Sequence, residues 1–146
     1  MSEKKSYRQH PNFKTAERNR AYYELLIKSG KKYQLWEWLL TILFYSALHY
    51  VKTFLAVVHQ RPPNTITSHS ALSVELSRLK RKKQLPKSIQ RNYEKFRNYS
   101  RIARYHYLES YGDWNDPDFV QLVQVDCVEF FNSIRKFVLH ELETAS

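Results

Sequence analysis

The spacing of proline is the feature that most constrains how this chain folds. Its prolines lie at positions 11, 62, 63, 86 and 117, and its only glycines are Gly30 and Gly112. Proline interrupts helix interiors, whereas β-rich folds require many turns that contain glycine and proline. The long proline-free segments therefore predict long helices and an all-α fold.

Hydrophobic spacing within these segments predicts five helices joined by short connections. We expect them over about 15–29, 33–59, 70–83, 87–110 and from 117 onward. Ala21, Tyr22, Leu25 and Ile27 are expected on the buried side of the first helix. A length of 146 residues suits one domain. The prediction is a single up-and-down five-helix bundle over residues 13–146, preceded by a disordered polar tail over 1–12.

The second expected helix is apolar on nearly every side, as in LWEWLLTILFYSALHYV, which predicts a helix surrounded by others. Its most hydrophobic part, 38–48, is too short to cross a membrane, which needs about 20 apolar residues. The first residues contain no apolar run of the signal-peptide kind. The single cysteine, Cys127, falls in an apolar helical pattern and is interpreted as a core residue. These features predict a cytoplasmic protein with no membrane contact.

Positive charge is concentrated in one stretch of the chain. The formal net charge is +10, and residues 77–107 contain eleven Lys or Arg against one acid, Glu94. Residues 108–146 contain eight acids against Arg135 and Lys136. A basic surface of this kind attracts polyanions, so we expect RNA as the partner. The predicted RNA-binding residues are Arg78, Lys80, Arg81, Lys82, Lys83, Lys87, Arg91, Arg97, Arg104 and Tyr105.

Several site chemistries lack their residues in this sequence. The six histidines are scattered, without the Glu-x-x-His spacing of helical-bundle metal sites, and one cysteine provides no zinc pair. Two glycines do not make a phosphate-binding loop. We therefore expect no metal and no cofactor. His49 is interpreted as a satisfied core histidine.

The fourth expected helix contains residues suited to RNA cleavage without a metal. A histidine titrates near neutral pH and transfers protons, and an arginine holds a phosphate and its developing charge. Arg101 and His106 form such a pair. At about 100° per residue they lie about 140° apart on a straight α-helix, so a kink, or a site between two copies, is needed to bring them to one target.

The five-helix pattern, the segment FYSALHYVKTFLA and the motif Arg101-Ile-Ala-Arg-Tyr-His106 resemble the HEPN domains. That resemblance implies an all-α, often dimeric domain, many of whose members are metal-independent ribonucleases of toxin–antitoxin or defence systems. It implies Arg101 as phosphate binder and His106 as acid–base, with the motifs of two protomers meeting at the interface.

The resemblance leaves a second function open. Active members usually carry a polar residue after the motif arginine, where this chain has Ile102. An inactive RNA-binding or assembly module, acting as accessory subunit of a larger complex, is therefore the alternative to an endoribonuclease. A purely structural helical partner is a third reading. We expect a homodimer and a partner protein, either an antitoxin or a larger complex.

Overall fold

A computed structural model describes residues 6–29, 35–62, 65–106 and 116–145. All the regular elements in these ranges are helical: η1 (Tyr7–Gln9), α1 (Pro11–Lys28), α2 (Trp36–Val57), α3 (His69–Arg81), α4 (Lys87–Arg101), η3 (Ile102–His106), α6 (Pro117–Gln121), η4 (Leu122–Asp126) and α7 (Cys127–Ala145). The first of the η elements is a 3-10 turn, and η3 and η4 are π-helical turns.

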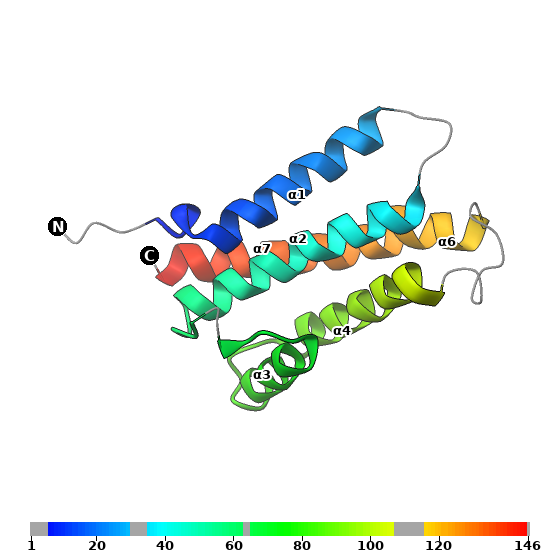
Figure 1. Cartoon of the computed structure of the whole chain (residues 1–146). Helices are drawn as coiled ribbons and strands as arrows, with labels where there is room; N and C mark the ends of the chain where they lie inside the picture. Colours follow the sequence, from blue (N-terminus) through cyan, green and yellow to red (C-terminus); the bar gives the residue numbers. More distant parts are fainter. Residues whose placement is uncertain (1–5, 30–34, 63–64, 107–115, 146) are drawn as a thin grey trace.

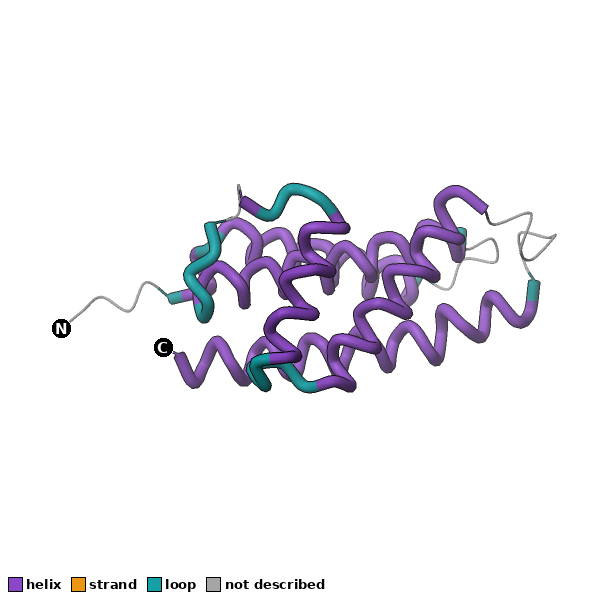
Figure 2. The backbone as a smooth tube through the Cα atoms, turned by 90° about the horizontal axis from the view of Figure 1, so that it is seen from below, coloured by secondary structure: helices purple, strands orange, loops and turns teal. Residues whose placement is uncertain are grey.

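The helices form the predicted all-α bundle of five helical segments within the described residues, if η3 is counted with α4, and η4 with α6 and α7. In Figure 1, α1, α2, α4 and α7 run along one general direction. The shorter α3 lies across this direction at one edge, as Figure 2 also shows. The expectation of an all-α five-helix bundle is confirmed.

The central helix is α2, which packs against α1 on one side and α7 on another. It is long and apolar enough to cross a membrane by length and composition, but 67% of its most apolar stretch is buried inside the bundle. Fully buried Leu40, Phe44, Ala47 and Tyr50 follow its length. Most of this helix therefore lies in the core of the bundle, as its sequence predicts.

The N-terminal region differs from the prediction of a polar tail over 1–12. Residues 1–5 lie outside the described residues, but Tyr7 is buried, and its ring packs edge-on against Phe13 at 5.1 Å. The Tyr7 hydroxyl donates to the Glu143 carboxylate of α7. The tail prediction is therefore wrong for residues 6–12, because one aromatic side chain ties this segment to the core.

The first helix also begins earlier than predicted. Pro11 occupies its first turn, where a missing N–H has no consequence, and the His10 imidazole caps it by accepting from the Asn12 amide at 3.2 Å. Thr15, predicted near the start, lies inside the helix and donates to the Pro11 carbonyl oxygen. Pro11 therefore starts a helix here.

The predicted buried side of the first helix is wrong. Tyr22 and Leu25 are 53% and 65% exposed, and Ala21 is also exposed, whereas Phe13, Ala16 and Tyr23 face the core. Ala16 is fully buried where α1 crosses α2, and the Ser46 hydroxyl of α2 donates to its carbonyl oxygen at 2.7 Å. The small side chain permits this close approach and so determines which side of α1 is buried.

The fourth predicted helix changes its pitch before its end. Residues 87–101 are α-helical and 102–106 form a π turn, while the predicted end at 107–110 lies outside the described residues. The last helix begins as predicted, because Asp116 caps α6 by accepting from the Asp118 amide at 2.9 Å, with Pro117 next to it. A second π turn then separates α6 from α7.

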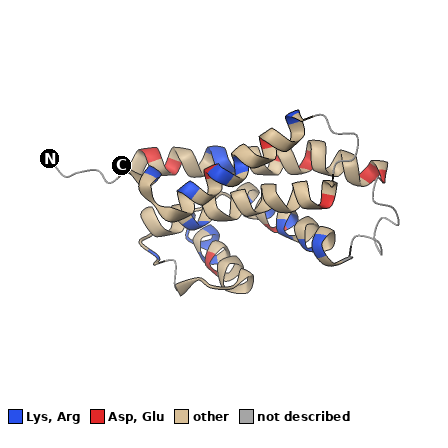
Figure 3. Ribbon diagram, turned by 45° about the horizontal axis from the view of Figure 1, so that its top comes forward, with Lys and Arg blue, Asp and Glu red and all other residues tan. Residues whose placement is uncertain are grey.

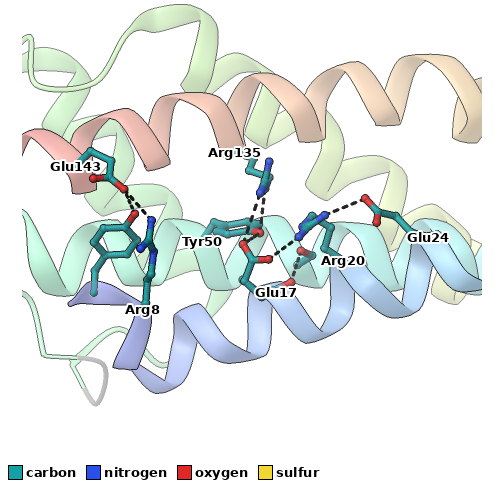
Figure 4. Close-up of polar contacts among 10 residues, drawn as sticks. Arg8, Glu17, Arg20, Glu24, Tyr50, Arg135 and Glu143 are labelled. Atoms are coloured by element: carbon teal, nitrogen blue, oxygen red, sulfur yellow. Dashed lines mark hydrogen bonds and ion pairs between the residues drawn. The ribbon is translucent and has the colours of Figure 1, made fainter. Parts of the chain in front are cut away.

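A polar network joins α1, α2 and α7. The Tyr50 hydroxyl donates to the Glu17 carboxylate at 2.6 Å and accepts from Arg135 Nε at 3.0 Å. Arg20 pairs with Glu17 at 2.6 Å and with Glu24 at 2.9 Å. Figure 4 shows Tyr50 between Glu17 and Arg135, so these polar groups hold three helices together.

Candidate nucleic-acid interface

The exposed side of α4 carries a line of basic side chains. Lys87, Arg91, Lys95 and Arg101 are all exposed, and we refer to these four residues as the α4 ridge. Their spacing places them on one broad side of the helix, opposite the buried residues Tyr93, Phe96 and Ser100. Figure 3 shows Lys and Arg positions along α4. The ridge offers positive charge over the length of the helix.

The predicted cluster 78–83 lies at one end of this ridge, in the last turn of α3 and the connection to α4. Arg81, Lys82 and Lys83 are exposed, and Lys83 has a left-handed backbone with φ of 59°. Lys80 is half-buried, and Arg78 forms an ion pair with Glu75. With a rise of about 1.5 Å per residue, Arg101 lies about 21 Å along the helix from Lys87. The exposed residues of the predicted RNA-binding set therefore form a line and not one compact patch.

Arg97 and Arg104 point toward the bundle and not along the ridge. The Arg97 guanidinium donates to the Ser73 hydroxyl of α3 at 3.0 Å and lies 3.7 Å from Glu94. Arg104 donates to the Tyr45 hydroxyl at 2.6 Å and to the Ser100 carbonyl oxygen at 3.3 Å. Both arginines are half-buried, so their guanidinium groups are held in place by protein contacts.

Arg101 is the exposed arginine at the end of α4. Its guanidinium donates to the Asn98 side-chain oxygen at 3.0 Å. A depression of about 230 Å³ beside it is lined by Glu94, Arg97, Asn98 and Arg101. This places the predicted phosphate binder at the surface, where a phosphodiester reaches it without unfolding the helix.

The π turn changes the relation between positions 101 and 106. In a π-helix the hydrogen bonds span five residues instead of four, so each turn contains more residues. In a π turn, residue i+5 therefore lies nearly over residue i, as residue i+4 does in an α-helix. Since residues 102–106 are π-helical, the backbone brings position 106 close to the side of the helix that Arg101 occupies. The side chain of His106 lies outside the described residues.

A histidine that sequence analysis did not single out lies beside the two half-buried arginines. His69 is the first residue of α3, and its ring lies 6.5 Å from that of Tyr45, the residue that binds Arg104. Burial, and next the positive charges of Arg97, Arg104 and Lys52, lower the pKa of His69. Its position at a junction of three helices gave no signal in the sequence.

An aromatic pocket of about 320 Å³ opens one turn beyond Arg101. It is lined by Glu37, Trp38, Thr41, Ala103, Arg104 and Tyr105. Trp38 and Tyr105 are 58% and 69% exposed, and Glu37 is 9% exposed. Tyr105 was predicted to bind RNA, but Glu37 and Trp38 were not, because the second helix is apolar on nearly every side and its sequence does not show which residues border a cavity.

Outside these sites, Cys127 matches its predicted role as a core residue, whereas His49, predicted as a satisfied core histidine, has a polar partner but is only half-buried. Cys127 is fully buried, and burial raises the pKa of its thiol. His49 Nδ1 lies 2.8 Å from the Asn12 side-chain oxygen, and burial lowers the pKa of this histidine. Among the described residues, no group of three His, Cys, Asp or Glu side chains is placed to hold a metal ion.

A larger depression, of about 620 Å³, lies between η1, α1 and α7. Its walls include Arg8, Glu17, Arg135 and Glu143, and these groups pair within the protein, with Arg8 at 3.4 Å from Glu143 and Arg135 at 3.6 Å from Glu17. Because its charges pair with one another, this depression is better suited to a structural role than to binding a polyanion.

Comparisons with protein-family models, with curated proteins and with solved structures found no match for this chain.

Proposed function

We propose that this protein binds RNA along the α4 ridge and cleaves it without a metal ion, as a cytoplasmic endoribonuclease of the toxin–antitoxin or defence kind. The observation that carries the proposal is the π turn over Ile102–His106, which aligns position 106 with the exposed Arg101 at the end of a basic helix side. A straight α-helix separates these two positions by about 140°.

The chemistry assigns one task to each residue. The ribose 2′-hydroxyl loses its proton and attacks the adjacent phosphorus, the bond to the 5′-oxygen breaks, and that oxygen takes up a proton. The products are a 2′,3′-cyclic phosphate and a free 5′-hydroxyl. The permanently charged Arg101 stabilises the extra negative charge on the phosphate oxygens, and His106 transfers a proton.

A second copy of the chain completes this scheme. The 2′-hydroxyl loses its proton on one side of the phosphorus, and the 5′-oxygen takes one up on the opposite side. The single His106 of one chain can serve only one of these two transfers at a time. A homodimer that brings two Arg101–His106 pairs together supplies both, and a partner protein that covers the same surface regulates access to it.

Cleavage of single-stranded RNA in EDTA tests the proposal. Arg101→Ala and His106→Ala are expected to lose at least about 100-fold in rate, in line with the removal of a transition-state donor or a general acid–base group. Lys136→Ala, which removes an exposed charge from α7, is the control and keeps the wild-type rate. Equal cleavage by wild type and both site variants contradicts the assignment, provided that circular dichroism shows the variants folded.

RNA binding without cleavage is the second candidate, favoured by the exposure of all four ridge residues and by Ile102 beside Arg101. It predicts binding that weakens with salt, because basic side chains that bind phosphates release counterions. Changing Lys87, Arg91 and Lys95 to Gln lowers the slope of log affinity against log salt by about 0.7 for each phosphate that the variant no longer neutralises. The same change at Lys14, Arg18 and Lys28 of α1 leaves the slope unaltered. An affinity that does not depend on salt contradicts both candidates.

A further inference from the structure

The aromatic pocket beside Arg104 has the features of a site for one flat ligand. Its volume of about 320 Å³ lies at the lower end of the range for small-molecule sites. Trp38 from α2 and Tyr105 from η3 both line it, and both retain more than half of their surface exposed to solvent. Large aromatic side chains that stay exposed around a concavity are the surfaces on which unpaired bases stack in RNA-binding proteins.

One wall of this pocket is fixed by contacts inside the protein. The Arg104 guanidinium carbon lies 5.2 Å from the ring centre of Tyr105 and 5.4 Å from that of Tyr45. Arg104 is itself anchored by the Tyr45 hydroxyl and the Ser100 carbonyl oxygen. This cation–π contact favours one placement of the Tyr105 ring before any ligand arrives. A preformed wall loses little conformational freedom on binding.

The polar lining of the pocket includes a carboxylate, Glu37, together with Thr41 and Arg104. Glu37 is 9% exposed and lines the pocket. An ionised carboxylate only accepts hydrogen bonds, so Glu37 favours a ligand that presents N–H donors to it. The flat walls and this acceptor together specify a planar ligand with N–H groups on its edge.

We propose that this pocket holds one unpaired guanine base, stacked on Trp38 and Tyr105, with its Watson–Crick edge toward Glu37. Guanine presents two adjacent donors on that edge, N1–H and N2–H, which match the two oxygens of a carboxylate. Adenine and cytosine present one amino group beside an acceptor nitrogen, and uracil presents one N–H between two carbonyl oxygens, so each sets an acceptor against the carboxylate.

This inference rests on the proposed RNA binding and adds the substrate feature that the protein selects. The pocket lies within one helical turn of Arg101, since its lining residues Ala103, Arg104 and Tyr105 are two to four residues further on. A guanine in the pocket places a neighbouring phosphate of the same strand at Arg101. The protein therefore prefers single-stranded RNA with a guanosine next to the phosphate that Arg101 binds.

Binding of short 2′-O-methyl oligonucleotides, measured by fluorescence anisotropy, tests the proposal without cleavage, because these lack the attacking hydroxyl. Each is a uridine strand with one central guanosine, inosine, adenosine or cytidine. We expect the guanosine strand to bind most tightly, and inosine, which lacks the N2 amino group, to lose part of that advantage. Glu37→Gln, nearly the same in shape, reduces the preference for guanosine while the other strands bind about as before.

Trp38→Leu and Tyr105→Leu test the stacking, and each is expected to weaken binding of the guanosine strand about 5- to 150-fold. Trp36→Leu is the matched control, because Trp36 does not line the pocket, and it leaves the affinity unchanged. Equal binding of all four strands, or wild-type affinity in Trp38→Leu and Tyr105→Leu, overturns the pocket while salt-dependent binding on the ridge still stands. Loss of salt-dependent binding to every strand, by contrast, overturns the proposed function itself.

Discussion

At the scale of single residues, Tyr50 connects three helices through one hydroxyl group. It donates to Glu17 on α1 and accepts from Arg135 on α7. Tyr50→Phe removes both hydrogen bonds and keeps the ring in the core, so we expect a loss of about 1–2 kcal/mol in the free energy of unfolding. Urea titration at pH 7 measures it. Tyr99→Phe is the control, since within the described residues the Tyr99 hydroxyl has no partner, and its loss has little effect.

The same network predicts a dependence of stability on pH. Burial raises the pKa of Glu17, but hydrogen bonds from Tyr50 and Arg20 and the charges of Arg20 and Arg135 outweigh it and hold the pKa below its ordinary value. A depressed carboxyl pKa contributes stability above the unfolded pKa, and this contribution is lost as pH falls from about 5 through the folded value. Urea midpoints measured from pH 7 to pH 3 should show a smaller fall in Glu17→Gln than in wild type. Parallel curves for the two proteins would contradict this role of Glu17.

At the scale of elements, the contact between α1 and α2 depends on the small side chain of Ala16. This residue is fully buried beside Ser46, whose hydroxyl donates to its carbonyl oxygen. Ala16→Leu forces extra volume into a packed crossing, and we expect a loss of about 2–3 kcal/mol in the free energy of unfolding. The same substitution at the exposed Ala21 is the matched control and costs less than about 0.5 kcal/mol. Equal unfolding midpoints for the two variants would show that the crossing is not tightly packed.

The π turn at the end of α4 predicts that cleavage depends on the angle between positions 101 and 106 around the helix axis. Inserting one alanine after Arg104 turns position 106 by about 100° relative to Arg101, and we expect cleavage to fall to the level of His106→Ala. Deleting Arg104 converts the π turn into an α-turn and keeps positions 101 and 106 on the same side. Its cleavage rate should therefore equal that of Arg104→Ala. A folded insertion variant that cleaves as fast as wild type would show that cleavage does not depend on the angle between positions 101 and 106.

The sequence predicts only those elements that produce a recognisable pattern of residues along the chain. Proline spacing and hydrophobic period predicted the bundle and the central α2, because both follow from backbone and burial rules that act along the chain. They did not predict the buried side of α1, where the adjacent pair Tyr22 and Tyr23 supplies apolar residues to both sides of the helix. No residue pattern marks the extra residue of a π turn, so the relation of Arg101 to position 106 emerged only from the structure.

The candidate site was predictable in part for the same reason. The basic residues of α4 gave a charge signal, and their exposure along the ridge agrees with it. Glu37 and Trp38 gave none, since a pocket between α2 and η3 depends on the packing of segments more than sixty residues apart. The inward contacts of Arg97 and Arg104 likewise depend on tertiary partners, Ser73 and Tyr45, that helical spacing does not identify.

At the scale of the whole molecule, the exposed apolar side of α1 and the net charge together predict how two copies associate. Tyr22 and Leu25, three residues apart, share a side of α1 and are both more than half exposed. Apolar side chains of this kind favour burial against a second copy, while a formal charge of +10 on each chain opposes it. Salt screens the repulsion and leaves the apolar attraction intact, so we expect the dimer to strengthen as salt rises.

Mass measurement by light scattering over a range of salt concentrations checks this expectation. Wild type should shift from monomer toward dimer between low and moderate salt, the opposite direction to RNA binding, which salt weakens. Leu25→Lys adds a charge to the apolar side and should keep the protein monomeric, whereas Val74→Lys, at an equally exposed position on α3, should not. This contact through α1 is separate from the one in the cleavage scheme, because α1 and α4 lie on different sides of α2 in Figure 1. A strict monomer at micromolar concentration in all salts would remove both associations. The single-chain pocket for guanine would then still be open to test, because its lining residues come from one chain.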